Sequence, residues 1–450
     1  MSKFALLFLI VFFGGIIVAV AHTPVAAFVL YQLVYFLNPE TRWWGVSIPD
    51  LRYSLITVVF MMLMLALRYK QLNHYSSLRK QPAVKWLLAI LLMYYLVYFF
   101  ALVPELHWRF TFDFTKLILI LFIAYKLLTT PAALTAALWV YIVGAAYIGY
   151  VATVTGRNGF GRVENIGMVD TGSDSNMTAA ALVPPIVLLM YYAWLGSWKV
   201  RLLCILFGAY IVNGLVLINS RGAFIGAMAG ATIFILYMLF SAQQRKGQRL
   251  VALLIVISGL AGFVRLADDT FWMRMQTLQQ VEDQDASGSH RIEFWLATFD
   301  MMEDYPKGTG VGGYILLSPN YLPEHYFERR TIGKAVHSSW FQALSEVGWP
   351  GPILFVCLLV CLYRQGRETK QFALQQGETD IYFKILALEA GFVGYLISAS
   401  FIDRFRAEVL YWMVLFLIVA ANVYYLQYKH GVKVTTIESG SDTDKGNHAR

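Results

Sequence analysis

The sequence predicts an all-α polytopic protein that crosses a membrane many times. Of its 450 residues, 58% are hydrophobic, and the mean hydropathy of +0.56 lies far outside the range of soluble domains. Many segments hold roughly 17–20 apolar residues, each long enough to cross a hydrocarbon core of about 30 Å. One long polar stretch, residues 265–348, interrupts this pattern. We therefore expect about 12 transmembrane helices and one large, partly helical loop, which we term the polar module.

Basic residues in short loops indicate the orientation of the helices. Lys and Arg gather at 68–80, 199–201, 245–249 and 364–370, and the positive-inside rule assigns such loops to the cytoplasm. The same rule accounts for the net charge of +8 without a nucleic-acid partner. Crossings counted between these loops alternate without exception. The expected spans, besides an element within 4–38, are approximately 51–67, 86–103, 113–128, 133–153, 177–195, 202–219, 222–240, 250–264, 349–363, 382–400 and 407–427.

The chain divides into a few regions by composition. Residues 4–38 form two apolar stretches broken by His22-Thr23-Pro24, so this element is either two spans or one broken or re-entrant span. The three cysteines lie inside apolar runs, which indicates packing rather than disulfides or a metal site. The expected organisation is a transmembrane region at 1–264, the polar module at 265–348, C-terminal transmembrane helices at 349–428 and a disordered cytoplasmic tail at 429–450.

Arg221 is the first candidate functional residue. The step Ser220-Arg221-Gly222 connects two spans at the outer face with almost no loop. An arginine there gains nothing from the positive-inside effect, and the small residues that follow leave room for a ligand. The pattern therefore indicates an anion site, and the alternative is an arginine that anchors the helix at the membrane interface.

Arg291 is the second candidate, at the start of a predicted amphipathic helix. It follows Ser287-Gly288-Ser289-His290, and Ile292, Trp295, Leu296 and Phe299 share one face of this helix, which Tyr305-Pro306 ends. A cation at a helix N-terminus opposes the helix dipole unless an anion lies nearby. The alternative is an ordinary surface pair with Asp283, Asp285 or Glu293.

His337 is the third candidate, directly before Ser338-Ser339-Trp340. A histidine near neutral pKa can act as a catalytic base, although a lone histidine at a helix start is commonly a cap or a surface residue.

The glycine cluster 308–313 lacks the ending of a phosphate-binding loop, so we interpret it as a turn or a packing site. The histidines show no metal-ligand spacing, and no metal site is expected.

Many further cations lie in the outward loops. The positive-inside rule predicts that this face should contain few of them, so their number indicates a polyanionic ligand at bilayer depth. A lipid-linked pyrophosphate fits such a site. These cations are Arg109, Lys116, Arg157, Arg162, Arg404 and Arg406.

The order and spacing of these motifs resemble one known family. Ser220-Arg221-Gly222-Ala223, the Ser-Gly-x-x-Arg-x-x-x-Trp segment at 287–295, the glycine cluster, and His337 before Glu346-Val347-Gly348-Trp349 are similar to motifs of the O-antigen ligase and O-antigen polymerase superfamily. The resemblance covers approximately residues 170–425.

The resemblance implies a metal-independent GT-C glycosyltransferase of the bacterial inner membrane, with the polar module as its periplasmic catalytic loop. An O-antigen ligase transfers a glycan en bloc from undecaprenyl pyrophosphate to lipid A–core oligosaccharide, with inversion and no cofactor. By position, Arg221 and Arg291 would hold the pyrophosphate, and His337 would lie by the reacting centre as the base. Lys116, Arg162 and Lys334 are further candidates for binding the pyrophosphate.

Three other functions fit parts of the pattern. The same residues would serve an O-antigen polymerase, whose acceptor is a second lipid-linked glycan, or a protein O-oligosaccharyltransferase. A transporter or flippase for lipid-linked sugars is the alternative outside the enzyme class. Its charged residues should follow a central path through the membrane, whereas here intramembrane charges are few, chiefly Lys384 and Glu389.

Overall fold

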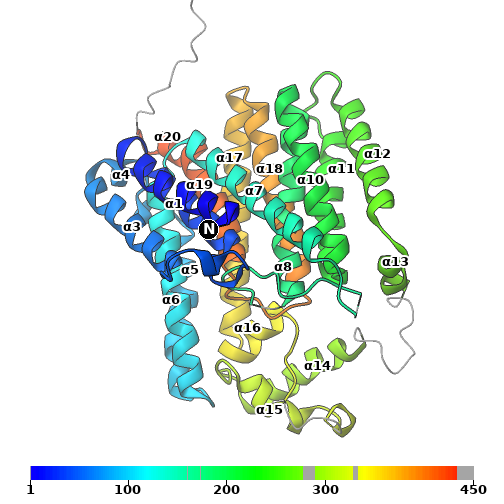
Figure 1. The fold of residues 1–450 in the computed structure, drawn as a ribbon. Helices are drawn as coiled ribbons and strands as arrows, with labels where there is room; N and C mark the ends of the chain where they lie inside the picture. Colours follow the sequence, from blue (N-terminus) through cyan, green and yellow to red (C-terminus); the bar gives the residue numbers. More distant parts are fainter. Residues whose placement is uncertain (1, 160, 173, 277–288, 328–332, 433–450) are drawn as a thin grey trace, which may run out of the picture.

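The computed structural model describes residues 2–159, 161–172, 174–276, 289–327 and 333–432, and within these ranges the regular elements are all helical (Figure 1). The α-helices are α1 (Lys3–Ala21), α2 (Val25–Leu37), α3 (Tyr53–Leu67), α4 (Tyr69–Tyr75), α5 (Val84–Val97), α6 (Pro104–Leu127), α7 (Pro131–Thr155), α8 (Ser175–Ala181), α9 (Val183–Leu195), α10 (Trp198–Ile218), α11 (Arg221–Phe240), α12 (Gln248–Leu266), α13 (Asp269–Gln276), α14 (Ser289–Asp304), α15 (Gly313–Tyr321), α16 (Ser339–Val347), α17 (Pro350–Gln375), α18 (Thr379–Ala399), α19 (Glu408–Ala421) and α20 (Gln427–Lys429). Single 3₁₀ turns occupy Pro39–Thr41, Gly45–Ser47, Leu78–Lys80, Tyr98–Phe100 and Glu324–Tyr326, and a π-helical turn occupies Asn422–Leu426.

Eight helices of the described chain are long and apolar enough to cross a membrane. They are α1, α7, the α8–α9 pair, α10, α11, α12, α18, and the C-terminal helix from α19 to α20; the bent pair α3–α4 would make a ninth. The expected spans in α5, α6 and α17 are not among them, because α5 is short and the other two carry several charged residues. The all-helical fold is confirmed, and the count of about 12 spans stays a prediction.

The break predicted at His22-Thr23-Pro24 divides the N-terminal element into two helices. α1 ends at Ala21 and α2 begins at Val25. Phe28 and Phe36 of α2 are buried against Trp412 of α19, whereas α1 leaves many apolar side chains exposed. The first helix is therefore peripheral, and the second belongs to the core.

A glycine contact joins α11 to α18 near the centre of the bundle. A Cβ atom on Gly226 would lie 2.3 Å from the Gly394 carbonyl oxygen, and one on Gly230 would lie 2.9 Å from the Ala390 carbonyl oxygen. Small residues four apart let two membrane helices approach backbone to backbone. At one end of this contact, a Cβ on Gly222 would meet Phe401 Cβ at 3.0 Å. The start of α11, with Arg221, is thereby held against the chain that follows α18.

The described part of the polar module lies beyond one end of the bundle, where α14, α15 and α16 are grouped (Figure 1). Its small core contains Phe294, Met301, Tyr314 and Val336. The helix predicted from Arg291 onward is confirmed as α14, which ends at Asp304, directly before Tyr305-Pro306.

Only part of the apolar face predicted for α14 packs. Trp295 stacks on the Phe341 ring, whereas Ile292, Leu296 and Phe299 are exposed. The fully buried side chains come from the adjacent face, with Phe294 and Met301. Both faces of this helix carry apolar residues, so its periodicity alone did not identify the buried one. Ser287 and Gly288 of the predicted motif, together with Asp283, Asp285 and the tail from 433 onward, lie outside the described residues.

The glycine cluster is a tight packing segment, as the sequence indicated. Gly308, Gly310 and Gly312 all adopt positive φ angles. The segment is bonded on both sides: Leu102 N donates to Thr309 O at 3.0 Å, and Thr309 N donates to Ser345 O at 2.8 Å. The glycines therefore let the backbone between α14 and α15 pass between the α5–α6 turn and α16.

Substitution of these glycines tests that constraint. A Cβ on Gly308 would lie 2.6 Å from Gly348 N and 2.7 Å from Glu346 O, whereas one on Gly377, also at positive φ, meets nothing within 4 Å. Gly377→Ala should cost about 1 kcal/mol for the left-handed backbone, and Gly308→Ala should cost a further ~1–3 kcal/mol for overpacking. Thermal unfolding of the detergent-solubilised variants measures the difference. Equal losses of stability in the two variants would contradict the packing role.

Candidate functional site

Arg221, Arg291 and His337 lie together at one end of the bundle, although each comes from a different element. Arg221 begins α11, Arg291 is in the first turn of α14, and His337 precedes α16. Burial lowers the pKa of Arg291, and the charge of Arg221 lowers it further. The Phe401 ring connects the two, since Arg291 Cζ lies 6.0 Å from its centroid and the helix of Arg221 packs on it at Gly222. We term Arg221, Arg291 and His337 the arginine–histidine cluster.

His337 occupies an unusual backbone conformation. Its φ of 54° lies in the left-handed region, which non-glycine residues adopt only when the surroundings enforce it. Its imidazole is 48% exposed. Partial desolvation lowers the pKa of His337, the charge of Arg291 lowers it further, and Asp174 opposes them. The imidazole is therefore held in its neutral form around neutral pH.

Asp403 is a site residue that the sequence reasoning missed. Its Oδ2 atom lies 3.6 Å from His337 Nδ1, longer than a hydrogen bond, and its Oδ1 accepts from Ser338 N at 3.1 Å. Burial raises the pKa of Asp403 to about 7, although the N–H groups of His337 and Ser338 oppose the shift. The carboxyl group thus fixes the backbone at His337 and titrates near neutrality. In the sequence, Arg404 and Arg406 after Asp403 indicated a cationic site, and no local pattern distinguished the carboxylate.

Asp174 is the second carboxylate of the site. It caps the N-terminus of α8, accepting from Asn176 N at 2.8 Å and from Met177 N at 3.2 Å. Its charge raises the pKa of both Arg291 and His337, so it faces the arginine–histidine cluster. A capping carboxylate is a common local feature, and only the tertiary structure brings this one to the site.

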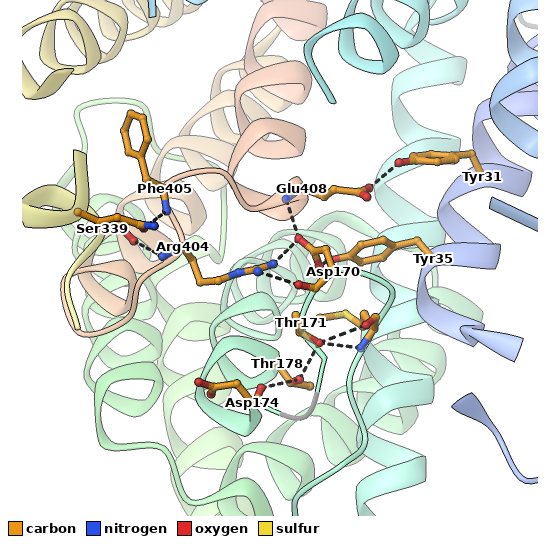
Figure 2. Close-up of polar contacts among 12 residues, drawn as sticks. Tyr31, Tyr35, Asp170, Thr171, Asp174, Thr178, Ser339, Arg404, Phe405 and Glu408 are labelled. Carbon is orange, nitrogen blue, oxygen red and sulfur yellow. Dashed lines mark hydrogen bonds and ion pairs between the residues drawn. The ribbon is translucent and has the colours of Figure 1, made fainter. Parts of the chain in front are cut away.

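Hydrogen bonds fix the turn at 400–406, which carries Asp403, on the start of α16. Ser339 Oγ accepts from Arg404 N at 3.0 Å (Figure 2). It also donates to Ile402 O at 2.8 Å, and Trp340 Nε1 donates to Ser400 Oγ at 3.0 Å. These bonds hold the 400–406 turn against the segment that carries His337.

Comparison with known families identifies the segment that carries the cluster. Residues 205–356 match the family model described as O-Antigen ligase, and Arg221, Arg291 and His337 all lie within the match. This segment is similar to the O-antigen ligase family. No curated protein matches the chain. The apolar helices and this similarity indicate a multi-pass membrane protein with a segment of the O-antigen ligase and polymerase type.

Residues outside the ligase-family segment complete the site. Arg404 forms an ion pair with Asp170 and also donates from Nη1 to the Asp170 carbonyl oxygen at 2.7 Å (Figure 2). Glu408 N donates to Asp170 Oδ2 at 2.9 Å, and Tyr31 donates to the Glu408 carboxylate at 2.6 Å. Burial lowers the pKa of Arg404, but Asp170 and the nearby Tyr35, Tyr395 and Glu408 together oppose it, and the pKa is raised. The start of α19, the 400–406 turn, the segment before α8 and α2 are thereby joined.

A second buried ion pair is formed by the other arginine of this turn. Arg406 pairs with Glu346 of α16, whose carboxylate also accepts from Tyr94 at 2.8 Å and from Gln342 Nε2 at 3.0 Å. Burial lowers the pKa of Arg406, but Glu346 and Tyr94 oppose it and the pKa is raised. Both arginines that follow Asp403 in the turn are therefore paired with another carboxylate.

The excess of outward cations is smaller than the sequence indicated. Among the six, only Arg109 makes no ion pair within the described residues. Lys116 and Arg162 pair with carboxylates close to them in the sequence, whereas the partners of the other three cations come from distant segments. The pairs are Lys116–Asp113, Arg157–Asp268, Arg162–Glu164, Arg404–Asp170 and Arg406–Glu346.

The three remaining candidates take different positions. Arg162 Nη2 donates to Asn176 Oδ1 at 3.2 Å, so it lies at the start of α8, close to Asp174. Lys116 is exposed on α6 and pairs with Asp113 at 2.6 Å. Lys334 Nζ lies over the Phe327 ring at 5.9 Å. No contact described for Lys116 or Lys334 joins either to the arginine–histidine cluster.

In the described ranges, no three His, Cys, Asp or Glu side chains gather in a way that could hold a metal ion.

The electrostatics of His337 can be tested directly. Neutral imidazole reacts with diethyl pyrocarbonate, so modification of His337, followed by peptide mass spectrometry, reports its titration. We expect a midpoint below about pH 6.5. Asp174→Asn should move it lower, because the carboxylate that raises the pKa of His337 is lost while the amide oxygen still caps α8. Asp300→Asn, at an exposed position on α14, should leave the midpoint unchanged; an equal shift in both variants would contradict the assignment.

Proposed function

We propose that the chain is an O-antigen ligase that transfers a glycan en bloc from undecaprenyl pyrophosphate to lipid A–core oligosaccharide at the periplasmic face of the bacterial inner membrane. One observation supports this above all: two guanidinium groups and a neutral imidazole, from three separate elements, lie together at one end of a membrane-helix bundle. That combination suits displacement of a diphosphate by a hydroxyl group.

Arg221 and Arg291 are proposed to hold the diphosphate leaving group. Burial lowers the pKa of Arg291, and repulsion by the charge of Arg221 lowers it further; a bound diphosphate would relieve that repulsion. As the anomeric C–O bond breaks, negative charge grows on the leaving phosphate. Guanidinium groups stabilise this charge through charge-assisted, bidentate hydrogen bonds, without a metal ion. Arg162, near Asp174 at the start of α8, is a further candidate for the same anion, and Lys116 and Lys334 are weaker ones.

His337 is proposed as the base. It is held neutral by desolvation and by Arg291, so it can accept the proton of the acceptor hydroxyl as the new glycosidic bond forms. Attack in line with the departing diphosphate inverts the anomeric centre. Asp403, 3.6 Å from Nδ1, can stabilise the imidazolium that results.

The proposed topology has about 12 spans, with both termini in the cytoplasm and residues 265–348 as the periplasmic catalytic module. The arrangement of α14, α15 and α16 beyond one end of the bundle supports it, because the basic segments 199–201, at the start of α10, and 364–370, in the second half of α17, lie toward the other end (Figure 1). The divisions 1–264, 349–428 and 429–450 remain part of this proposal.

Substitution of the cluster tests the proposed roles. We expect Arg221→Ala and Arg291→Ala each to lower kcat about 10²–10³-fold through loss of leaving-group stabilisation, and His337→Ala about 10²–10⁴-fold. Arg291→Lys should also be impaired, because an ammonium group cannot bond bidentately. The assay is reconstitution with purified undecaprenyl-pyrophosphate glycan and rough lipopolysaccharide, with Lys307→Ala as the control cation in the polar module. Normal ligation by His337→Ala would remove it as the base.

The acceptor and the metal requirement can be tested in the same assay. Transfer should continue undiminished in excess EDTA, because arginines stabilise the leaving group. Loss of activity that Mg²⁺ restores would contradict this. Replacement of rough lipopolysaccharide by a second lipid-linked glycan, or by a pilin-like protein, distinguishes a polymerase or a protein glycosyltransferase from a ligase.

A further inference from the structure

One side of α14 exposes apolar side chains, although this helix belongs to the polar module. Ile292, Leu296 and Phe299 recur at the spacing of a single helix face, and all three are exposed. At 3.6 residues per turn they lie within about 60° of one another around the helix axis. We term these three residues the apolar stripe. A contiguous exposed patch of this kind marks a surface that another apolar surface covers.

The acidic side chains of α14 lie beside the apolar stripe. Glu293, Asp300 and Asp304 gather on the neighbouring side of the helix, centred about 90° away around its axis. Glu303 falls toward the apolar side, but only in the last turn. For most of its length α14 therefore separates a side suited to an apolar environment from a side suited to water.

The apolar stripe is continuous with an exposed apolar face of α17. The ring of Phe299 stacks on the ring of Trp349, directly before α17, with the centroids 6.1 Å apart. From there, exposed apolar side chains recur every three or four residues along α17. They are Trp349, Ile353, Val356, Val360 and Tyr363. On a helix that is expected to cross the membrane, such a face meets lipid chains.

This face of α17 is too short to cross a membrane by itself. Trp349 and Tyr363 are 14 positions apart in the sequence, and the exposed side chains of Arg364 and Arg367 follow. At 1.5 Å per residue the face is about 21 Å long. A hydrocarbon core is about 30 Å thick, so about 9 Å remain uncovered. A helix that lies across the start of α17 would supply this thickness, because a helix is about 10–12 Å wide.

Contacts place α14 across the ends of several helices of the bundle (Figure 1). The ring of Trp295 lies 6.2 Å from the ring of Phe401, in the turn after α18. Phe299 meets the start of α17, and Lys307 Nζ, just beyond α14, lies 4.6 Å from the centre of the Phe100 ring, just beyond α5. Successive positions along α14 thus contact the ends of three separate helices. The helix crosses these ends and does not extend any of them.

We propose that α14 is inserted by its apolar stripe into the adjacent leaflet of the bilayer, with its acidic side in water. Lipid acyl chains cover Ile292, Leu296 and Phe299, and α14 completes the apolar thickness that α17 lacks. The last turn, with Glu303, lies at the level of the head groups. The polar module is thereby anchored to the membrane along α14. This inference does not depend on the proposed function. If that function holds, insertion fixes the depth at which Arg291, next to Ile292, meets a lipid-linked diphosphate.

Spin labels measure this depth without any transfer reaction. After the three native cysteines are replaced by alanine, Ile292→Cys places a label on the apolar stripe. Leu316→Cys is the matched control, because Ile292 is 55% exposed and Leu316, on α15 of the same module, is 56% exposed. Asp300→Cys places a label on the acidic side of α14 itself. In proteoliposomes, the label at 292 should collide more often with oxygen, which concentrates among acyl chains, than with a water-soluble nickel chelate. The labels at 300 and 316 should show the reverse preference.

Two results would overturn the insertion of α14. One is a label at 292 that the nickel chelate reaches as readily as it reaches the label at 316. The other is a label at 292 that is shielded from both reagents, since this indicates a protein partner or a second copy on the apolar stripe.

Photolabelling of the unmodified protein provides a measurement free of substitutions. A phospholipid with a diazirine in its acyl chain should label peptides of α14 as well as those of α17, whose exposed face is the internal reference. Label on α17 with none on α14 would overturn the inference. A protein that transfers no glycan, but whose α14 is labelled, would contradict only the proposed function.

Discussion

Two buried ion pairs in the turn that carries Asp403 are the constraint on which the site depends. Arg404 with Asp170 and Arg406 with Glu346 connect segments that are far apart in the sequence, and both pairs are largely shielded from water. Burial of such pairs contributes little net stability. Loss of one partner, however, leaves a buried charge unpaired and lowers the free energy of unfolding by about 3–5 kcal/mol. The pairs therefore act mainly by excluding other arrangements of the 400–406 turn. They fix the position of Asp403, and Asp403 in turn fixes the backbone at His337.

The cluster and its surroundings form an electrostatic gradient across a short distance. Arg221 lowers the pKa of Arg291, and Arg291 lowers the pKa of His337. Asp174 opposes both shifts. Burial keeps Asp403 close to half-protonated near neutral pH. His337 lies between these environments in a left-handed backbone conformation. Its strain is sustained because Val336 is buried in the polar module and Ser338 N is bonded to Asp403.

The sequence predicted those features that depend on local pattern. The all-helical class, the break at His22-Thr23-Pro24, the helix beginning near Arg291 and the turn role of the glycines follow from hydropathy, helix-breaking residues and backbone freedom. The resemblance then singled out the three residues that the structure brings together. Their joint location is a finding, whereas their chemical roles remain proposals.

The remaining features depend on contacts that no local pattern encodes. Asp403 and Asp174 lie far from His337 in the sequence, and a carboxylate in a short turn has no signature of its own. The outward arginines seemed an excess for the same reason, because the partners of Arg404 and Arg406 come from distant segments. The buried face of α14 was ambiguous because this helix carries apolar side chains on both faces.

The glycine contact between α11 and α18 has a consequence for how the protein can diversify. With backbones in direct contact at Gly226 and Gly394, Arg221 and the chain entering the 400–406 turn form one stiff frame. The helices of the polar module, α14 to α16, are attached around this frame. If the proposed function holds, these helices could change for a new glycan while the frame that carries Arg221 keeps its geometry. The diphosphate and the sugar would then be recognised by separate parts of the molecule.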